Sequence, residues 1–289
     1  MSAQNHPHEE WDMVIESKHS LFDLHLRDVW RYRDLLTLMV RRDFVSLYKQ
    51  TILGPIWFFL QPLLTTFTFL IVFGKLAKIE TGETPQPLFY LSGIVLWTYF
   101  SECLVKTSTV FKDNTSIFGK VYFPRLIVPL SIVVSNLLKL GIQSLLFILI
   151  LLYYIFFKDY SIEFTPYLLL LPLMVVLMAM LGLSLGMIIS SLTTKYRDLA
   201  FLVAFGVQLL MYATPIIYPL SNLAKNEKAL NILKWNPMAP IVEGVRKGLF
   251  NEGYFSFGYL GYAVAVSVVL LSVAVIVFNK VEKSFIDTI

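Results

Sequence analysis

The sequence predicts an all-α polytopic membrane protein with six transmembrane helices, amphipathic interfacial helices before them, and short re-entrant helices between spans five and six. Three observations lead to this fold class. Of the 289 residues, 56% are hydrophobic and only 15% are charged, whereas soluble domains carry about a quarter charged residues. Several uncharged runs are long enough to cross a bilayer as helices. Most Lys and Arg residues fall on one side of the membrane when these runs are taken as spans.

The first twenty residues are predicted to form a mobile cytoplasmic tail. Residues 1–20 are polar and acidic and contain no apolar run, so we expect no cleavable signal peptide. His6 and His8 lie in this tail. Two histidines in a flexible segment are a weak basis for a metal site, and we predict none there.

Residues 21–50 are predicted to form amphipathic helices that lie in the membrane surface. In residues 21–34, one side carries Phe22, Leu26, Val29 and Trp30. The following helix has an apolar face of Leu36, Val40, Phe44, Leu47 and Tyr48 and a basic face of Arg41, Arg42 and Lys49. This pattern breaks at Gly54-Pro55, immediately before an aromatic and uncharged run that we expect to enter the bilayer.

The remaining chain, residues 51–289, is predicted to be one six-span membrane domain. A bilayer core needs about 20 apolar residues in a helix. Suitable apolar runs with few or no charges lie near residues 50–74, 88–110, 129–157, 164–194, 199–224 and 253–279. With a cytoplasmic N-terminus, six spans place the C-terminus in the cytoplasm too, and most Lys and Arg residues then lie on the cytoplasmic side.

The connection between spans two and three is predicted to contain a short cytoplasmic helix. Asp113-Asn114 is a helix-start signal, and Gly119 is a stop signal. The intervening segment is polar and projects between two spans, so we expect it to be available to a partner.

The connection between spans five and six predicts a re-entrant pair of short helices near the outer surface. Pro215 and Pro219 interrupt helical hydrogen bonding in span five. Asn236-Pro237 predicts a turn, and Pro240 suits the first turn of a new helix. A broken helix at membrane depth is tolerated only against protein or a water-filled cavity.

No motif for catalysis or cofactor binding is present. The sequence contains no GxxxxGK[ST] phosphate loop and no HExxH motif, and its four histidines lie within residues 1–25. The one cysteine, Cys103, excludes an internal disulfide. We therefore expect no catalytic residue, no metal site, no cofactor in this chain, and no nucleic-acid partner.

Few charged or small-residue motifs occur inside the predicted spans. Glu102 and Lys106 are four residues apart and are predicted to pair, while Lys139 either snorkels or faces an interior. Gly182 and Gly186 form a GxxxG motif, which we interpret as helix packing. An ion-driven carrier usually keeps acidic residues at mid-membrane, and none is clearly placed there, which argues against that class.

Aromatic residues in the spans have two interpretations. They form belts at the membrane surfaces, or they line a path along which sugar rings slide, because flat rings give weak and repeated stacking. The candidates for a path are Trp57, Phe58, Tyr90, Trp97, Tyr99, Tyr212 and Tyr218.

Four segments occur together and in order along the chain. They are RRDFVSLYKQTILGPIWFFLQP at 41–62, KVYFPR at 120–125 with Pro129 after it, YRDL at 196–199, and NPMAPIVEGVRKGLF at 236–250. From about Leu21 to the C-terminus, the chain resembles the permease subunits of bacterial polysaccharide ABC exporters, in the type-2 ABC permease family.

The resemblance implies a half-transporter that forms a homodimer and pairs with two copies of a separate ABC ATPase, which would hold ATP and Mg²⁺. Its substrate would be a lipid-linked, O-antigen-like polysaccharide that enters from the cytoplasmic side of the bacterial inner membrane, among membrane lipids. One six-span unit is too small to enclose a wide path, whereas two facing units can enclose one.

The resemblance also implies roles for particular residues. Contact with the ATPase would involve Asp113, Asn114, Ile117, Phe118 and Lys120. The interfacial gate and its hinge would comprise Arg41, Arg42, Asp43, Leu53, Gly54 and Pro55. An external gate would involve Pro215, Pro219, Pro237 and Pro240.

Two alternatives remain open from the sequence. One is a permease of the same family for teichoic acid, a small lipid or a drug. The other is a membrane pore or scaffold that needs no ATPase. A neighbouring reading frame with a Walker A motif would favour an exporter over the pore or scaffold.

Overall fold

The computed structural model describes residues 26–46, 48–49, 51–118, 123–162, 165–196, 198–223 and 227–286. Within these ranges the chain is helical with short turns and contains no strand. The N-terminal helices are α1 (Leu26–Arg31) and α2 (Arg33–Ser46). The following elements are η1 (Gly54–Ile56), α3 (Trp57–Phe69), η2 (Leu70–Leu76), α4 (Gln86–Ser108), α5 (Val110–Asp113), α6 (Thr115–Phe118), α7 (Ile127–Lys158), η3 (Pro166–Leu170), α8 (Leu171–Thr193), α9 (Leu199–Tyr212), η4 (Leu220–Leu223), α10 (Glu227–Lys234), α11 (Met238–Phe250) and α12 (Phe257–Ile286).

Five helical stretches in the described chain are long and apolar enough to cross a membrane. They are Gly54–Leu76, Gln86–Ser108, Ile127–Lys158, Pro166–Thr193 and Phe257–Val281. The structure therefore confirms an all-α, multi-pass membrane protein and confirms five of the six predicted spans by length and composition. The predicted fifth span differs: α9 has 14 residues, or about 21 Å of helix, and non-helical chain follows it.

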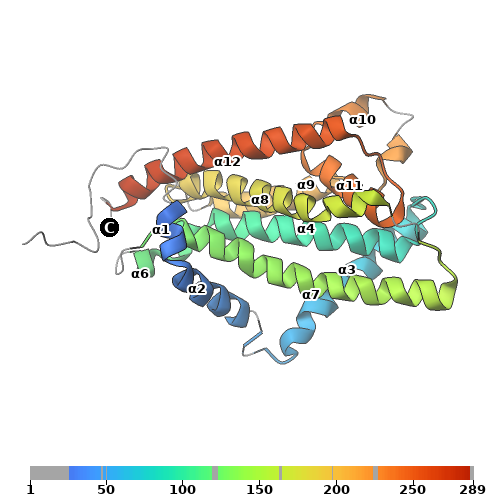
Figure 1. Cartoon of the computed structure of the whole chain (residues 1–289), viewed down its shortest axis with the longest axis horizontal. Coiled ribbons are helices and arrows are strands. Elements are labelled where there is room, and N and C mark those ends of the chain that lie inside the picture. The colour runs from blue at the N-terminus through green and yellow to red at the C-terminus, as the bar shows by residue number, and fades with distance from the viewer. Residues whose placement is uncertain are drawn as a thin grey trace, which may run out of the picture.

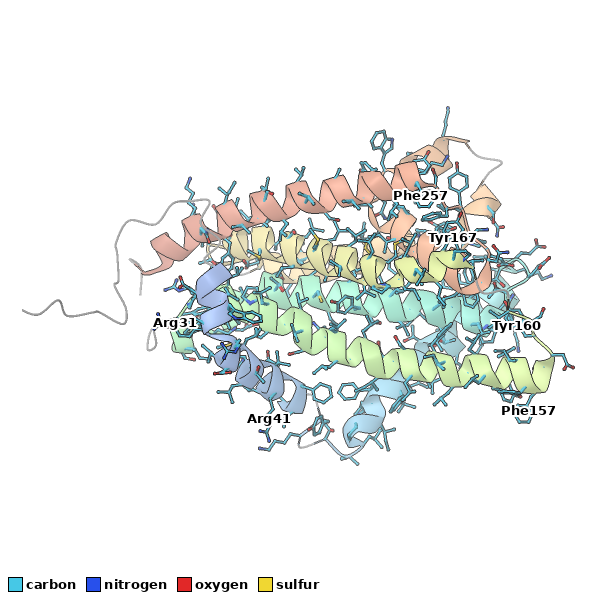
Figure 2. All side chains as sticks on the ribbon, in the orientation of Figure 1. Arg31, Arg41, Phe157, Tyr160, Tyr167 and Phe257 are labelled. Atoms are coloured by element: carbon cyan, nitrogen blue, oxygen red, sulfur yellow. The ribbon has the colours of Figure 1, made fainter. Side chains whose placement is uncertain are left out.

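The long helices run side by side along the longest axis of the molecule (Figure 1). The helices α1, α2 and α6 lie at the end where α12 finishes, which we call the inner end. The opposite end, which we call the outer end, carries α10 and α11. Figure 2 places Arg31 and Arg41 toward the inner end, whereas Phe157 and Phe257 lie toward the outer end. Both of these phenylalanines are largely exposed, as expected for aromatic residues at a membrane surface.

Helix α4 is the centre of the subunit. It is buried along most of its length and packs against α8, α7 and α3. Its apolar side chains form the largest core cluster together with residues of α8 and α11. By contrast, Val207 is the only buried residue of α9, and only four residues of α3 are buried. The centre of one subunit is therefore packed with side chains, while α3 and α9 form an exposed edge.

The close approach of α8 to α4 depends on Gly182 and Gly186. A Cβ atom at Gly182 would lie 2.9 Å from the Cβ of Cys103. A Cβ at Gly186 would lie 2.5 Å from the Cβ of Thr107 and 2.9 Å from the Leu104 carbonyl oxygen. These separations are shorter than van der Waals contact, so only glycine lets the two backbones approach this closely. The packing interpretation of the GxxxG motif is confirmed.

Candidate functional site

Helix α9 ends near the outer end, and a non-helical segment follows it. Two side chains from later in the sequence donate hydrogen bonds to the backbone carbonyl oxygens of this segment. Asn236 Nδ2 donates to the Ala213 oxygen at 2.9 Å. The guanidinium of Arg246 donates to the oxygens of Pro215 and Ile216, at 2.5 and 2.8 Å. Buried carbonyls require such partners. The broken segment is thus held in place by side chains rather than by a helical ladder.

Arg246 itself is enclosed by protein. Its side chain is 2% exposed, and it pairs with Glu243, which is fully buried, at 3.2 Å. The guanidinium also lies 3.7 Å from the centre of the Phe89 ring, a cation–π contact with α4. Burial lowers the pKa of Arg246 to about 10, so it remains charged at neutral pH. Burial raises the pKa of Glu243, and the charge of Arg246 opposes that rise.

Glu252 joins the loop between η2 and α4 to the end of α11. Its carboxylate accepts hydrogen bonds from the backbone N–H of Thr84 at 3.1 Å and from the Thr84 hydroxyl at 2.6 Å. A cavity of about 370 Å³ lies here, and its lining includes Glu243, Arg246 and Glu252. Of the predicted prolines, Pro219 lines this cavity. Pro215, Pro219 and Pro240 are buried, and Pro237 is half-buried.

The sequence interpretation named the four prolines of this region and missed the charged and amide groups that hold it. The available signal was the pair Glu243 and Arg246, three residues apart within residues 237–246, whose other members are apolar or glycine. On a solvated helix, such a pair is an ordinary surface feature.

The hinge predicted at Gly54-Pro55 joins α2 to the first span. Gly54 has a φ of +53°, a conformation that residues with a Cβ atom adopt at an energetic cost. Pro55 occupies the first turn of η1, where its fixed φ is suited to a helix start. Leu53 is partly exposed, and Arg41 and Arg42 are exposed. The chain therefore changes direction at the predicted position.

Across this hinge, the end of α2 contacts the start of α3. The rings of Phe44 and Phe58 are stacked, with centroids 5.6 Å apart. Phe44 also meets Tyr48 edge-on at 5.7 Å. Asp43 binds Arg42 at 2.7 Å and accepts a hydrogen bond from Ser131 of α7 at 3.5 Å. Helix α2 is thus connected to both α3 and α7.

The predicted contact segment at the inner end consists of two single helical turns, α5 and α6, with Asn114 between them. Asp113 is exposed and accepts a hydrogen bond from the Thr109 hydroxyl at 2.6 Å. Asn114 donates to the Val110 oxygen at 3.0 Å, and Ile117 is half-buried. Lys120 lies outside the described residues. Phe118 is buried, so it anchors α6 rather than offering a contact surface.

An apolar cluster connects this segment to α2 and α12. Phe111 stacks on Phe278 with ring centroids 4.8 Å apart. Met39 of α2 belongs to the same cluster, as does Phe118. One continuous apolar cluster therefore extends from α5 and α6 to α2, with residues of α7 and α8 between them.

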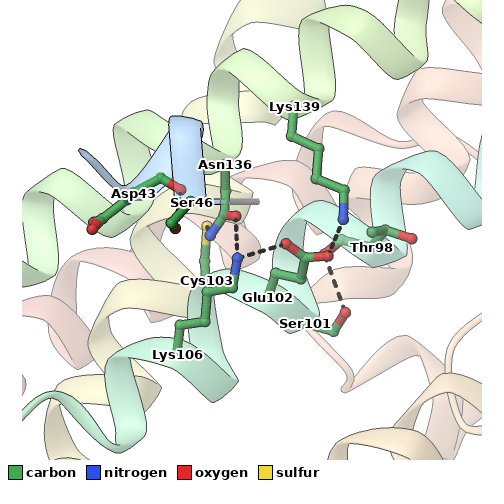
Figure 3. Close-up of polar contacts among 9 residues, drawn as sticks. All are labelled: Asp43, Ser46, Thr98, Ser101, Glu102, Cys103, Lys106, Asn136 and Lys139. Carbon is green, nitrogen blue, oxygen red and sulfur yellow. Dashed lines mark hydrogen bonds and ion pairs between the residues drawn. The ribbon is translucent and has the colours of Figure 1, made fainter. Parts of the chain in front are cut away.

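A charged cluster connects α4 with α7 inside the membrane region (Figure 3). Lys106 Nζ binds Glu102 at 3.0 Å and donates to Asn136 Oδ1 at 3.2 Å. Lys139 forms an ion pair with the other oxygen of Glu102. The predicted pairing of Glu102 with Lys106 is confirmed. Lys139 is buried and faces the protein interior, so the snorkelling alternative does not apply.

The aromatic candidates for a path fall into two groups. Trp57 and Tyr212 are 44% and 50% exposed on the α3–α9 edge, and Tyr218 is half-buried, with its hydroxyl donating to the Tyr212 oxygen at 3.0 Å. Phe58, Tyr90, Trp97 and Tyr99 are buried. Tyr90 and Tyr99 belong to the core around α4, where neither can touch a molecule that passes along the subunit surface.

The sequence is similar to a known transporter family and to proteins named for O-antigen export and polysialic acid transport. Residues 34–250 match the ABC-2 type transporter family. The chain is 28% identical over 264 residues to the O-antigen export system permease protein RfbA of Myxococcus xanthus, covering 91% of this chain and 98% of that protein. It is 26% identical to the protein of the same name from Klebsiella pneumoniae, covering 88% and 94% of the two chains. It is 24% identical to the polysialic acid transport protein KpsM of Escherichia coli, covering 82% and 89%.

Proposed function

The chain belongs to the ABC-2 type transporter family, and from this premise we propose that it is the membrane subunit of an exporter for a lipid-linked polysaccharide. The observation that carries the proposal is the similarity, over most of both chains, to permeases named for O-antigen and polysialic acid. These two substrates differ in chemistry, but both are polysaccharides. The substrate would move from the cytoplasmic side of the inner membrane to its outer side.

A separate ATPase would supply the energy, because this chain has no phosphate-binding loop. The candidate docking segment is α5 and α6, where Asp113 is exposed. The packing of Phe111 on Phe278 and the position of Met39 in the same cluster offer a mechanical route from this segment to α2. Closure of two ATPase subunits on ATP would displace α5 and α6 and thereby shift α2.

A second copy of the chain would complete the path. The interior of one subunit around α4 is packed, so a polymer cannot pass through it. The exposed edge formed by α3 and α9 carries large apolar side chains, among them Phe67, Phe201 and Phe205. Two such edges facing one another would enclose a path between subunits, with Trp57 and Tyr212 on its wall.

The experiment that tests this function is an in-frame deletion of the gene in its host, followed by analysis of lipid-linked glycans. We expect a polysaccharide to accumulate on its lipid carrier inside the cell and to disappear from the surface. Restoring the gene should reverse both changes. Normal surface polysaccharide in the deletion strain would overturn the proposal, and accumulation of a teichoic acid or a small lipid instead would assign the chain to that substrate.

A further inference from the structure

A small cavity, largely apolar but with a few amide and hydroxyl groups in its lining, lies in the middle of the membrane region, where four helices meet. Its volume is about 70 Å³, and it is lined by Gln61, Pro62, Thr65, Ile94, Trp97, Thr98, Gln143 and Met211. These residues come from α3, α4, α7 and α9. Such a volume holds several water-sized groups, which corresponds to one edge of a sugar ring rather than a whole oligosaccharide.

The cavity lies at the midpoints of three spans, which bring Thr65, Thr98 and Gln143 to it. Thr65 is the central residue of Gly54–Leu76, Trp97 is the central residue of α4, and Gln143 lies at the middle of α7. Polar side chains at this depth are energetically expensive, and they persist where they pair with one another or serve a function. Three spans therefore bring amide and hydroxyl groups to one place at the most apolar depth.

Gln143 has an unsatisfied donor in this cavity. The residue is 1% exposed, and its Nε2 atom has no hydrogen-bond partner among the described residues. A buried amide that only held helices together would have its donors satisfied by the neighbouring helix. An unpaired N–H donor that lines a cavity is instead what we expect of a group that binds a ligand only while the ligand is present.

The remaining lining restricts the chemistry of that partner. The Thr65 hydroxyl already donates to the Gln61 backbone carbonyl oxygen at 3.0 Å, so toward a ligand it acts as an acceptor. None of the lining side chains is ionisable. Charged groups lie one helical turn away, where the Glu102 carboxylate is already paired with both Lys139 and Lys106. A neutral ligand that offers a hydroxyl group beside an apolar face, as the edge of a sugar ring does, fits this lining better than a phosphate or an ammonium group.

We propose that this cavity is a hydroxyl-recognising subsite for one sugar residue of a passing polysaccharide, with Gln143 as its principal hydrogen-bond donor. The inference rests on the proposed export function and adds the position and chemistry of a contact to it. Gln61 is exposed and stands at the rim of the cavity on the α3–α9 edge. A polymer between two subunits would reach Gln143 past Gln61 and Thr65, with Trp97 as an apolar wall.

The first test compares Gln143→Met with Leu145→Met in a gene-deleted host. Methionine matches the size of glutamine but lacks the amide, and Leu145 lies on the same helix at the same depth with its side chain outside the protein. We expect both variants to reach the normal amount in the membrane. Gln143→Met should lower the rate at which polysaccharide reaches the cell surface about threefold to tenfold, as for loss of one hydrogen bond, whereas Leu145→Met should leave the rate unchanged. Thr98→Val should give a smaller decrease in the same direction.

The second test does not depend on how well Gln143→Met folds. A photo-reactive amino acid at Gln61 should form an adduct with the polysaccharide when cells are illuminated during export, and the same amino acid at Leu145 should form adducts with phospholipid alone. Phospholipid adducts alone from Gln61, or normal export by Gln143→Met, would overturn the subsite. Those results would leave the export function intact, because that function fails only if the deletion strain itself exports normally.

Discussion

Arg246 of α11 donates to the Ile216 carbonyl oxygen at 2.8 Å, thirty residues earlier in the chain. Ile216 lies just beyond the break in α9, where a continuous helix would have supplied backbone donors. The planar guanidinium can serve two neighbouring carbonyls at once, because its N–H groups are held in a rigid fork. Here it serves Pro215 and Ile216 together. One buried cation therefore fixes the backbone conformation of this segment at the outer end of the subunit.

Replacing this cation should destabilise the subunit. Arg246→Gln would leave two carbonyls and the fully buried Glu243 without their partner. Removal of one member of a buried ion pair typically costs about 3–5 kcal/mol. We expect a markedly lower melting temperature in detergent, and Arg246→Lys should fall between this variant and the natural protein because an ammonium group cannot span both carbonyls in the same plane.

Lys247→Gln is the matched control for this experiment, since Lys247 is the next residue on the same helix and its side chain donates to the Asn251 backbone oxygen at an exposed position. Its melting temperature should remain close to that of the natural protein. Equal stability of Arg246→Gln and Lys247→Gln would show that Arg246 does not hold the broken segment.

The end of helix α9 could be predicted from the sequence, but the side-chain hydrogen bonds that hold the following segment could not. Pro215 and Pro219 interrupt a helix through their own covalent structure, whatever surrounds them. The burial of Glu243 and Arg246 depends instead on which elements pack over α11, and an isolated amphipathic segment gives no information about that. The same reason applies to Tyr90 and Tyr99: ring chemistry identified them as path candidates, whereas the position of α4 at the centre of the bundle buried them.

Gly186 provides a test of the close packing between α8 and α4. An added methyl group at this position would lie 2.5 Å from the Cβ of Thr107 and 2.9 Å from the Leu104 backbone oxygen. Because a backbone atom cannot move aside independently, we expect Gly186→Ala to lower thermal stability by an amount typical of overpacking, about 1–3 kcal/mol.

Gly141→Ala is the control, because a Cβ atom there would have nothing within 4 Å. Alanine is favoured over glycine in a helix interior by about 1 kcal/mol, so this variant should be as stable as the natural protein or more stable. The melting temperatures of both variants, measured in the same detergent, test this difference. A similar loss of stability in both would contradict the packing role of Gly186.

The ion pair between Lys139 and Glu102 should behave as a coupled unit. Lys139→Met leaves Glu102 with Lys106 alone, and Glu102→Gln leaves two ammonium groups without a carboxylate. We expect each single variant to lower stability, by up to about 3 kcal/mol for such a largely buried pair. The double variant should be more stable than the sum of the single effects predicts, because the interaction between the two residues is lost only once and Lys106, which also donates to Asn136, is the one ammonium group left without a carboxylate. Additive losses in a double-mutant cycle would show that the two residues do not interact.

The stacking of Phe44 on Phe58 should fix α2 against the first span. An aromatic pair contributes about 0.5–1.5 kcal/mol beyond its buried area, so Phe44→Ala should loosen α2 without unfolding the spans. We expect faster proteolytic cleavage near the hinge at Gly54 and a normal melting temperature for the rest of the subunit. Phe67→Ala, in the same span but with an exposed ring, is the control and should leave the cleavage rate unchanged.

The last prediction concerns contact with the proposed ATPase. Asp113 is exposed at the inner end, and Lys120 follows it in the same connection. Reversing both charges, Asp113→Lys with Lys120→Glu, should weaken a complementary surface without disturbing the buried anchors Phe111 and Phe118. We expect the permease to be present in normal amount and the purified complex either to lose its ATPase subunits or to hydrolyse ATP without exporting polysaccharide.

Asp159→Lys makes a comparable charge reversal at the opposite end of the subunit, in an exposed residue directly after α7. It should retain both ATPase binding and export, because the proposed topology places that end on the side of the membrane away from the ATPase. Full export by the variant reversed at Asp113 and Lys120 would remove this segment from the docking surface. The proposed transmission through the Phe111–Phe278 contact would then be contradicted as well, since it requires the ATPase to bind α5 and α6.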